Sequence, residues 1–473
     1  MIRYISLAAL AAALVAAPVG AETLAQAVAS AYDTNPELAA QRAVVRQVDE
    51  QVPQALSFGR PTVDVTVAEQ QNGVDFTDNG RVFTSGLNIN QSLYRGGRTR
   101  TATNAADARI LAARARLRST ENTIVLDVVT AYSDVLRYAR VVDLNANQVK
   151  VLERELQASK DRFEVGDLTR TDVAQSDARL ANSRSNLISA RGLLSNARTA
   201  YARVVGHLPE DLAPTPTLPV LPGTQGQAVD FANVNNPALI AARFDEAAAR
   251  YDVSTIERER LPSLGIGVGA DYTKFNGGGG GGRFVQQGAF FTQNAGLQLS
   301  VPIYQAGAVA SRVRQAQERR SQLLATIGLT SRQVTESAIN AWVQIRTARA
   351  IIESSQVAVD ANALALEGVT QENQVGTRTI IEVLNAQQEF LITQVNLVTA
   401  RRDEFVGAYT LLAAVGAAEA AALEVPVTVY DPTVNAAAVR HRLIDLDTPR
   451  NLPPLPLPDK ALTVRSAPIG PQQ

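Results

Sequence analysis

The sequence predicts a mainly α-helical chain with a small amount of membrane-spanning β structure, built as an internal duplication. The first observation is the absence of proline from residues 62–208 and 303–425, stretches of 147 and 123 residues. Because proline interrupts helix interiors, these stretches permit very long helices. The second observation is that the two halves of the chain match, and the third is that four short segments alternate apolar and polar residues.

Composition excludes several classes of chemistry. The 473 residues include no cysteine and only two histidines, His207 and His441, and the formal net charge is −1. Without cysteine there is no disulfide, thiolate metal site, cysteine nucleophile or lipid-bearing cysteine. A near-neutral charge argues against nucleic-acid binding, which needs a basic face. We therefore expect no catalytic residue, no metal and no cofactor, and a chain that is not an enzyme.

The first 21 residues have the order typical of a secretory signal peptide. Arg3 precedes an apolar run over residues 7–17, and Val19-Gly20-Ala21 supplies the small residues of a cleavage site. After this segment, the chain has no run of the ~18–20 consecutive apolar residues that a membrane helix needs. We expect an exported protein that is periplasmic, secreted, or held in an outer membrane by β structure.

The two halves of the chain are tandem copies of one unit. Asn35-Pro36 recurs as Asn236-Pro237, and Val165-Gly166 recurs as Val375-Gly376. The offset grows around a run of six glycines at 277–282, which therefore lies in a loop. Constant offsets over such lengths indicate a repeat. The expected parts are a signal peptide (1–21), a first repeat (22–206), a linker (207–232), a second repeat (233–415), a further segment (416–448) and a proline-rich disordered tail (449–473).

Each repeat contains one β-hairpin, expected at 61–93 and 262–304. Valines at 63, 65 and 67 alternate with polar residues, and the same period of two runs through 264–272. The four strands are expected to have roughly 9–12 residues, the length that a tilted strand needs to cross a bilayer. Six phenylalanines near the distal ends of the strands favour an aromatic girdle at the membrane interface: Phe76, Phe83, Phe275, Phe284, Phe290 and Phe291.

A long helix follows each hairpin, over 97–163 and 307–373, and a shorter helix returns, over 169–206 and 379–415. Sixty-seven residues make a rod of about 100 Å, which must pack as a coiled coil. Gly166 and Gly376 fit the left-handed residue that closes a helix. Thr169 with Asp172 and Thr379 with Glu382 have the spacing of capping boxes at the start of each return helix.

Four membrane strands cannot stand alone, because open strand edges leave backbone groups unpaired in lipid. Closed barrels of this kind start at about eight strands. If these strands span a membrane, the chain must therefore oligomerise, with eight strands in a dimer or twelve in a trimer.

The arrangement resembles the TolC family of outer-membrane channel proteins over roughly residues 23–425. The resemblance rests on the duplicated Asn-Pro starts, the hairpin-to-helix junctions at 94–97 and 304–307, and the two helix tips. The tips read RFEVGDLTRTD (162–172) and VGTRTIIEVLNA (375–386). The resemblance implies a homotrimer in the outer membrane of a Gram-negative bacterium, with four strands per chain in a shared twelve-stranded β-barrel. Its long helices would form a periplasmic α-barrel, with an equatorial belt drawn from 207–232 and the segment after 416.

The resemblance also implies a gate at the periplasmic tip, closed by bonds between neighbouring hairpins. Arg378 maps onto the donor, and Thr171 and Asp172 of the adjacent protomer map onto the acceptors. The innermost acidic ring, a pore constriction, maps onto Glu382 and Asn385. Here the sequence departs from the family, because Asn385 stands where aspartate is usual.

Simpler interpretations of the same residues stay open. Asp172 and Glu382 are also placed to cap their helices, which contributes about 0.5–2 kcal/mol of stability and no gating. Arg378 has the alternative of a solvated surface arginine. Asn373 replaces an aromatic partner of the family's gate, which affects the expected tightness of closure.

The implied function is a passive exit duct that docks a periplasmic adaptor (membrane fusion) protein and an inner-membrane transporter of the ABC or RND type. The tip sequence and the lack of a lipid-bearing cysteine favour the branch that serves type I protein secretion. One alternative is the outer-membrane component of a multidrug efflux pump. The alternative from another class is a soluble periplasmic coiled-coil scaffold.

Overall fold

The computed structural model describes residues 21–72, 80–276, 288–420, 423 and 425–442. Residues 1–20 of the expected signal peptide, the six-glycine run and the proline-rich tail lie outside this range. In the described part of the chain, no helix combines the length and the apolar character that crossing a bilayer requires.

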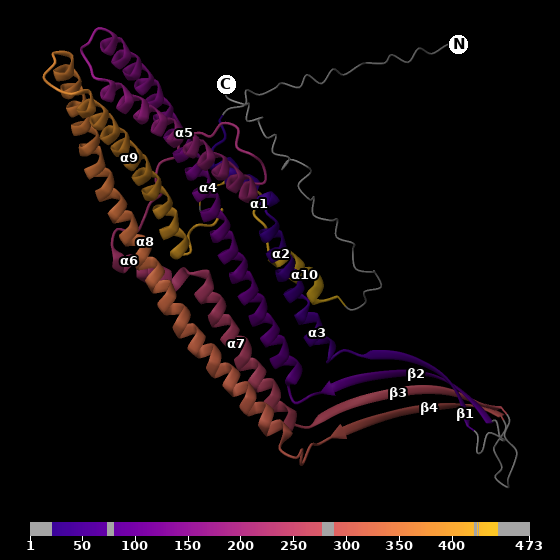
Figure 1. Cartoon of the computed structure of the whole chain (residues 1–473). Coiled ribbons are helices and arrows are strands. Elements are labelled where there is room, and N and C mark those ends of the chain that lie inside the picture. The colour runs from indigo at the N-terminus through magenta and orange to yellow at the C-terminus, as the bar shows by residue number, and fades with distance from the viewer. Residues whose placement is uncertain (1–20, 73–79, 277–287, 421–422, 424, 443–473) are drawn as a thin grey trace, which may run out of the picture.

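The described part is a long helical bundle with a curved sheet projecting from one end (Figure 1). The first repeat consists of α1 (Leu24–Thr34), α2 (Pro36–Asp49), α3 (Gln51–Ser57), β1 (Thr62–Asn72), β2 (Gly80–Tyr94), α4 (Arg98–Glu164) and α5 (Arg170–Val205). The second consists of α6 (Gln225–Asn235), α7 (Pro237–Glu257), a short 3-10 turn (Arg258–Arg260), β3 (Ser263–Asn276), β4 (Gly288–Ser300), α8 (Ala308–Gln374) and α9 (Ile380–Ala414). A last helix, α10 (Thr433–Arg440), follows.

Helices α4 and α8 both have 67 residues, and each begins and ends one residue later than the expected range. They run from the sheet to the far end of the bundle, where α5 and α9 turn back (Figure 1). At 1.5 Å per residue each is about 100 Å long. The two repeats are joined along this rod, because α4 packs against α7 and α9 of the second repeat. Arg402 on α9 pairs with Asp134 on α4, with 3.0 Å between Nε and Oδ1.

The second repeat begins earlier than the sequence indicated. Helix α6 starts at Gln225, inside the range expected to be linker, because the Thr224 side chain accepts a hydrogen bond from Gln227 N and caps the helix. Asn236 lies between helices α6 and α7 in the same way that Asn35 lies between helices α1 and α2. Helix α6 is therefore the copy of α1 in the second repeat. The prolines at 209–222 indicate a linker, and the range expected for this linker extends over the short helix that follows. The linker ends before Gln225.

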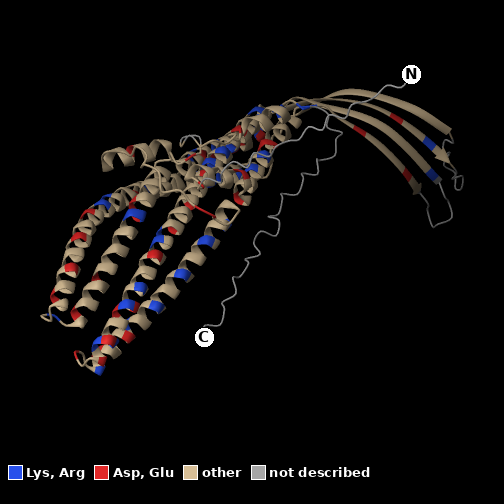
Figure 2. Ribbon diagram, turned by 90° about the horizontal axis from the view of Figure 1, so that it is seen from above, with Lys and Arg blue, Asp and Glu red and all other residues tan. Residues whose placement is uncertain are grey.

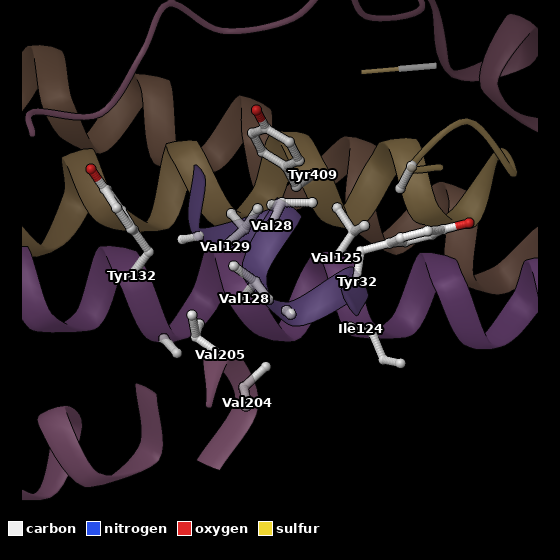
Figure 3. Packing of buried hydrophobic residues seen from close by; sticks show 14 of the residues in the cluster. Val28, Tyr32, Ile124, Val125, Val128, Val129, Tyr132, Val204, Val205 and Tyr409 are labelled. Carbon is white, nitrogen blue, oxygen red and sulfur yellow. The ribbon is translucent and has the colours of Figure 1, made fainter. Parts of the chain in front are cut away.

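The hydrophobic core lies midway along the bundle, where α1, α5 and α9 meet α4 (Figure 3). Val128, Tyr132 and Tyr201 are fully buried there. The Tyr132 hydroxyl donates to the carbonyl of Ala213, 2.6 Å away, in the linker. The segments expected to form the equatorial belt contribute too, since Leu221 and Val427 pack on this cluster.

The four strands form one antiparallel sheet in the order β1-β2-β3-β4. They have 11, 15, 14 and 13 residues, so three of them are longer than the expected 9–12. The difference arises because pairing continues beyond the apolar alternation into polar ends, as in Glu69 opposite Phe83 and Phe83 opposite Lys274. The outer edges of β1 and β4 have no strand partner in the described chain.

Over the part of the sheet nearer the helices, the register gives one apolar and one polar face, and toward the far end the apolar face also carries Glu69 and Lys274 beside Phe83. The apolar face carries the rows Val63–Ile89–Val268–Ala295 and Val65–Leu87–Ala270–Gln293. The polar face carries the rows Asp64–Asn88–Gly269–Asn294 and Thr66–Gly86–Asp271–Thr292. Figure 2 shows that charged residues are spread along the helices and are sparse on the strands.

The register divides the expected aromatic girdle between the two faces of the sheet. Phe83 and Phe291 share the apolar face with Tyr272, and Phe83 meets Tyr272 edge-on with 6.5 Å between ring centroids. Phe275 and Phe290 instead lie on the polar face, because their register positions alternate with those residues. A girdle on one face of the sheet therefore cannot include all four of these rings. Phe76 and Phe284 lie outside the described residues.

Candidate functional site: the two helix tips

Both helix tips close with a glycine in the left-handed conformation. Gly166 has φ 85° and Gly376 has φ 81°. Each tip also carries a hydrogen bond that reaches back across the turn, from Asp167 N to Arg162 O (2.9 Å) and from Thr377 N to Glu372 O (3.0 Å). A Cβ added to either glycine would meet no atom within 4 Å, so backbone conformation and not crowding selects glycine.

The return helices α5 and α9 start with reciprocal caps. The Asp172 carboxylate accepts from the backbone N of Thr169 at 3.0 Å, and the Glu382 carboxylate accepts from the backbone N of Thr379 at 2.9 Å. The hydroxyl of Thr169 also donates to Asp172, at 2.7 Å. These contacts satisfy backbone donors that a helix start otherwise leaves free. The tips are thus held in shape by short-range bonds.

Arg378 lies between two carboxylates of its own hairpin. Its Nε donates to Glu372 Oε2 at 2.7 Å, and its Nη1 donates to Glu382 Oε1 at 3.0 Å. These partners raise the pKa of Arg378, and the hydrogen bond to Glu372 contributes most. Its Nη2 takes part in none of the hydrogen bonds found in the described chain, so the guanidinium keeps a donor for a further partner.

Within one chain, Arg378 does not meet Thr171 or Asp172. The cap uses Oδ2 of Asp172, and Oδ1 makes no hydrogen bond in the described part of the protein. Capping and a bond to a neighbouring chain are therefore compatible for Asp172, since each uses a different oxygen. Glu382 differs, because its cap and its Arg378 contact occupy both oxygens.

Asn385 has a partner that the sequence analysis missed. Arg179 on α5 donates through Nη2 to Asn385 Oδ1 at 2.7 Å, and through Nη1 to Gln388 Oε1. This bond links the α4–α5 hairpin to the α8–α9 hairpin of the same chain. Because the Asn385 amide is uncharged, the positive charge of Arg179 beside the expected constriction is not neutralised by it. Arg179 stands seven residues after Asp172 on α5, so the two side chains lie on the same side of this helix.

Asn373 links the same two hairpins closer to the turn. Its Oδ1 accepts from Arg162 Nη1 at 3.3 Å, and its Nδ2 donates to the backbone carbonyl of Arg378 at 2.8 Å. One amide thus contacts α4 and fixes the loop that carries Arg378. The structure brings Arg378, Glu382 and Asn373 together, whereas Asn385 faces α5.

The contact between Arg378 and Glu382 is expected to be sensitive to acid. The backbone N–H of Thr379 and the Arg378 guanidinium hold the pKa of Glu382 below its ordinary value of 4.5. A group with a depressed pKa contributes while it is ionised, so the contact is complete above pH 4.5 and is lost as the pH falls through the lowered pKa. For the channel that the sequence resemblance implies, conductance in bilayers titrated from about pH 7 to about pH 3 should stay flat and then rise below about pH 4.5. Glu382→Gln should remove part of this rise, and a rise already complete at about pH 6 would contradict the assignment.

The two repeats coincide with two matches to one family of known proteins. The family model described as outer membrane efflux protein matches residues 27–207 and 228–417. The chain belongs to this family. Outer membrane efflux protein BepC of Brucella suis is 32% identical over 415 residues, which cover 88% of this chain and 90% of the relative. Outer membrane protein TolC of Vibrio cholerae is 25% identical over 389 residues, covering 81% of this chain and 88% of the relative.

The fold is shared with solved channel structures of this kind. The crystal structure of the Campylobacter jejuni CmeC outer membrane channel superposes with a TM-score of 0.73, at 15% identity, and covers 88% of this chain and 89% of CmeC. Membership confirms the resemblance to the TolC family, the mainly helical duplicated fold and the outer-membrane location. The family consists of channels, so the chain is not an enzyme, and the alternative of a soluble periplasmic scaffold is overturned.

Proposed function

We propose that three copies of this chain form an outer-membrane exit duct for type I protein secretion, together with a periplasmic adaptor and an inner-membrane transporter. The observation that carries the proposal is the combination of a two-faced sheet with two free edges and a pair of 67-residue helices that extend from it. Pairing β1 of one copy with β4 of the next satisfies both edges. Three copies then supply twelve strands, with the apolar face toward lipid and the polar face toward the pore.

The long helices support the same assembly. Helix α8 leaves an apolar stripe uncovered, in which Val343, Val357 and Leu364 are 47%, 66% and 72% exposed. These positions are separated by 14 and 7 residues, which are multiples of the seven-residue period of a coiled-coil seam. A neighbouring copy is the partner that completes the seam and closes the α-helical tunnel.

At the tip, the proposal assigns a gate to Arg378 and to Thr171 and Asp172 of the adjacent copy. The free Nη2 of Arg378 and the free Oδ1 of Asp172 are a matched donor and acceptor for this contact. The constriction is formed by Glu382 and Asn385, with Arg179 beside it. Val165 and Val375, at equivalent places on the two tips, are 74% and 75% exposed and are suited to docking the adaptor.

The tip sequence at 375–386 and the absence of cysteine support the secretion branch. A second cargo class has support from a specific observation, because BepC, which aligns along most of its own length, is named an efflux protein. The second candidate is therefore the outer-membrane component of a multidrug efflux pump.

The wild-type protein should fractionate with the outer membrane as a detergent-stable trimer, and a monomer would overturn the proposed duct.

Deletion of the gene distinguishes type I protein secretion from multidrug efflux. Loss of one or more proteins from the culture medium, with unchanged resistance to dyes and detergents, is expected for type I secretion. The reverse pattern would replace that function by efflux. Complementation with the intact gene is the control for both readouts.

A further inference from the structure

Two phenylalanine rings stack on the polar face of the sheet. Phe275 on β3 and Phe290 on β4 have ring centroids 5.7 Å apart and an interplanar angle of 25°. Phe275 pairs with Gly288, and Phe290 pairs with Thr273, so the two rings are diagonal neighbours on one face. Phe290 remains 45% exposed in spite of this contact. The pair therefore presents apolar surface outward from the sheet.

Polar side chains cover the part of that face that lies nearer the helices. Asn88 and Asn294 lie over Gly269 from both sides, and a Cβ there would come within 2.8 and 2.4 Å of their Oδ1 atoms. Asp271 lies over Gly86 in the same way, with its Oδ1 2.2 Å from the place of a Cβ. Amide and carboxylate oxygens crowded over glycines are costly to bury in hydrocarbon. This face consequently turns away from lipid, and Phe275 and Phe290 turn with it.

The rings are placed at the end of the sheet farthest from the helices. Phe275 belongs to the last residue pair of β3 with β4, next to the connecting segment 277–287. Their neighbours in the adjoining row on β2 are Val82 and Thr84, which are uncharged. The described polar face holds its two carboxylates, Asp64 and Asp271, nearer the helices. The outer end of this face thus lacks carboxylates and adds two aromatic rings beside the uncharged residues Gln70, Val82, Thr84 and Thr273.

We propose that Phe275 and Phe290 form an apolar constriction at the outer end of the pore, in series with the gate at the helix tips. The inference rests on the proposed function, because three copies bring six rings around one exit. Apolar constrictions hinder ions and water by dewetting, and they offer contact surface to apolar parts of a cargo. A role limited to stapling the β3–β4 hairpin is the competing explanation.

The first experiment locates the rings. The single native tryptophan is removed by Trp342→Phe, and a probe is introduced as Phe290→Trp or, as the matched control on the opposite face, Phe291→Trp. In vesicles, the probe at 290 should be quenched by aqueous iodide and not by brominated lipid, and the probe at 291 should show the reverse. Quenching of the probe at 290 by brominated lipid would overturn the inference.

The second experiment measures the constriction in planar bilayers, in an Arg378→Ser background that opens the tip. Phe275→Ser with Phe290→Ser should raise single-channel conductance by roughly 1.5-fold or more, because six apolar rings leave the path. Phe275→Leu with Phe290→Leu keeps the apolar character and should raise it less. Equal conductance in the Arg378→Ser parent, the double serine variant and the double leucine variant would overturn the proposed constriction without contradicting the proposed duct. A parent protein that forms no conducting trimer would overturn both.

Discussion

Replacing Arg378 with serine is expected to raise single-channel conductance roughly three- to tenfold, because a closed pore is limited by its narrowest charged contacts. The guanidinium holds Glu372 and Glu382 in its own hairpin and keeps Nη2 for the neighbouring chain. Serine removes all of these bonds at once. The hairpin itself should keep its shape, since the Thr379–Glu382 cap and the Gly376 turn do not depend on Arg378. The measurement is conductance of the purified trimer in planar bilayers at neutral pH.

Arg170→Ser is the matched control for this variant. Arg170 is an exposed arginine on the other tip, and it forms no hydrogen bond or ion pair within the described ranges. The Arg170→Ser substitution removes a positive charge from the same end of the molecule, as Arg378→Ser does, but breaks no hydrogen bond or ion pair of the described chain. Equal conductance of the Arg378 and Arg170 variants would show that Arg378 is a solvated surface residue. Asp172→Asn should reproduce part of the increase, because its single amide oxygen cannot serve both the Thr169 cap and the contact with Arg378.

The helix ends were predictable from sequence because their determinants are local. A glycine at φ near 80° and a threonine three residues before a carboxylate act within one turn of chain. The contacts of Asn385 and Asn373 were not predictable in the same way. Their partners, Arg179 and Arg162, are 206 and 211 residues away along the chain, and only the packing of the two hairpins brings them together.

The separation of Phe275 and Phe290 from the other two rings has a different origin. Closeness to the strand ends does not by itself decide the face of the sheet on which a ring lies. The period of two in β3 already separates Phe275 from Tyr272 and groups it with Asp271, so the parity was readable in the sequence. The register of β4 was the missing piece for Phe290, because the connecting loop length decides which residue faces which side.

Replacing Leu364 with glutamate is expected to abolish the trimer while leaving the single chain folded. Leu364 is 72% exposed within one chain, so the change breaks no contact in the described protomer core. The positions that correspond to Val357 and Leu364 in the first repeat are Asn147 and Arg154, which are polar and exposed. The apolar stripe therefore belongs to the second repeat alone, and ordinary solvent exposure does not explain it.

In a closed trimer, Leu364→Glu places a glutamate in each of three equivalent subunit interfaces. A carboxylate placed in an apolar seam without a partner costs several kcal/mol, and symmetry repeats that cost at each contact. Unheated gel electrophoresis and native mass spectrometry should show trimer for the wild type and monomer for Leu364→Glu. Leu364→Met is the control, because it keeps the apolar volume and should remain trimeric. A glutamate variant that stays fully trimeric would place the subunit seam on another face of α8, and the free edges of β1 and β4 would then be the main contact that holds the copies together.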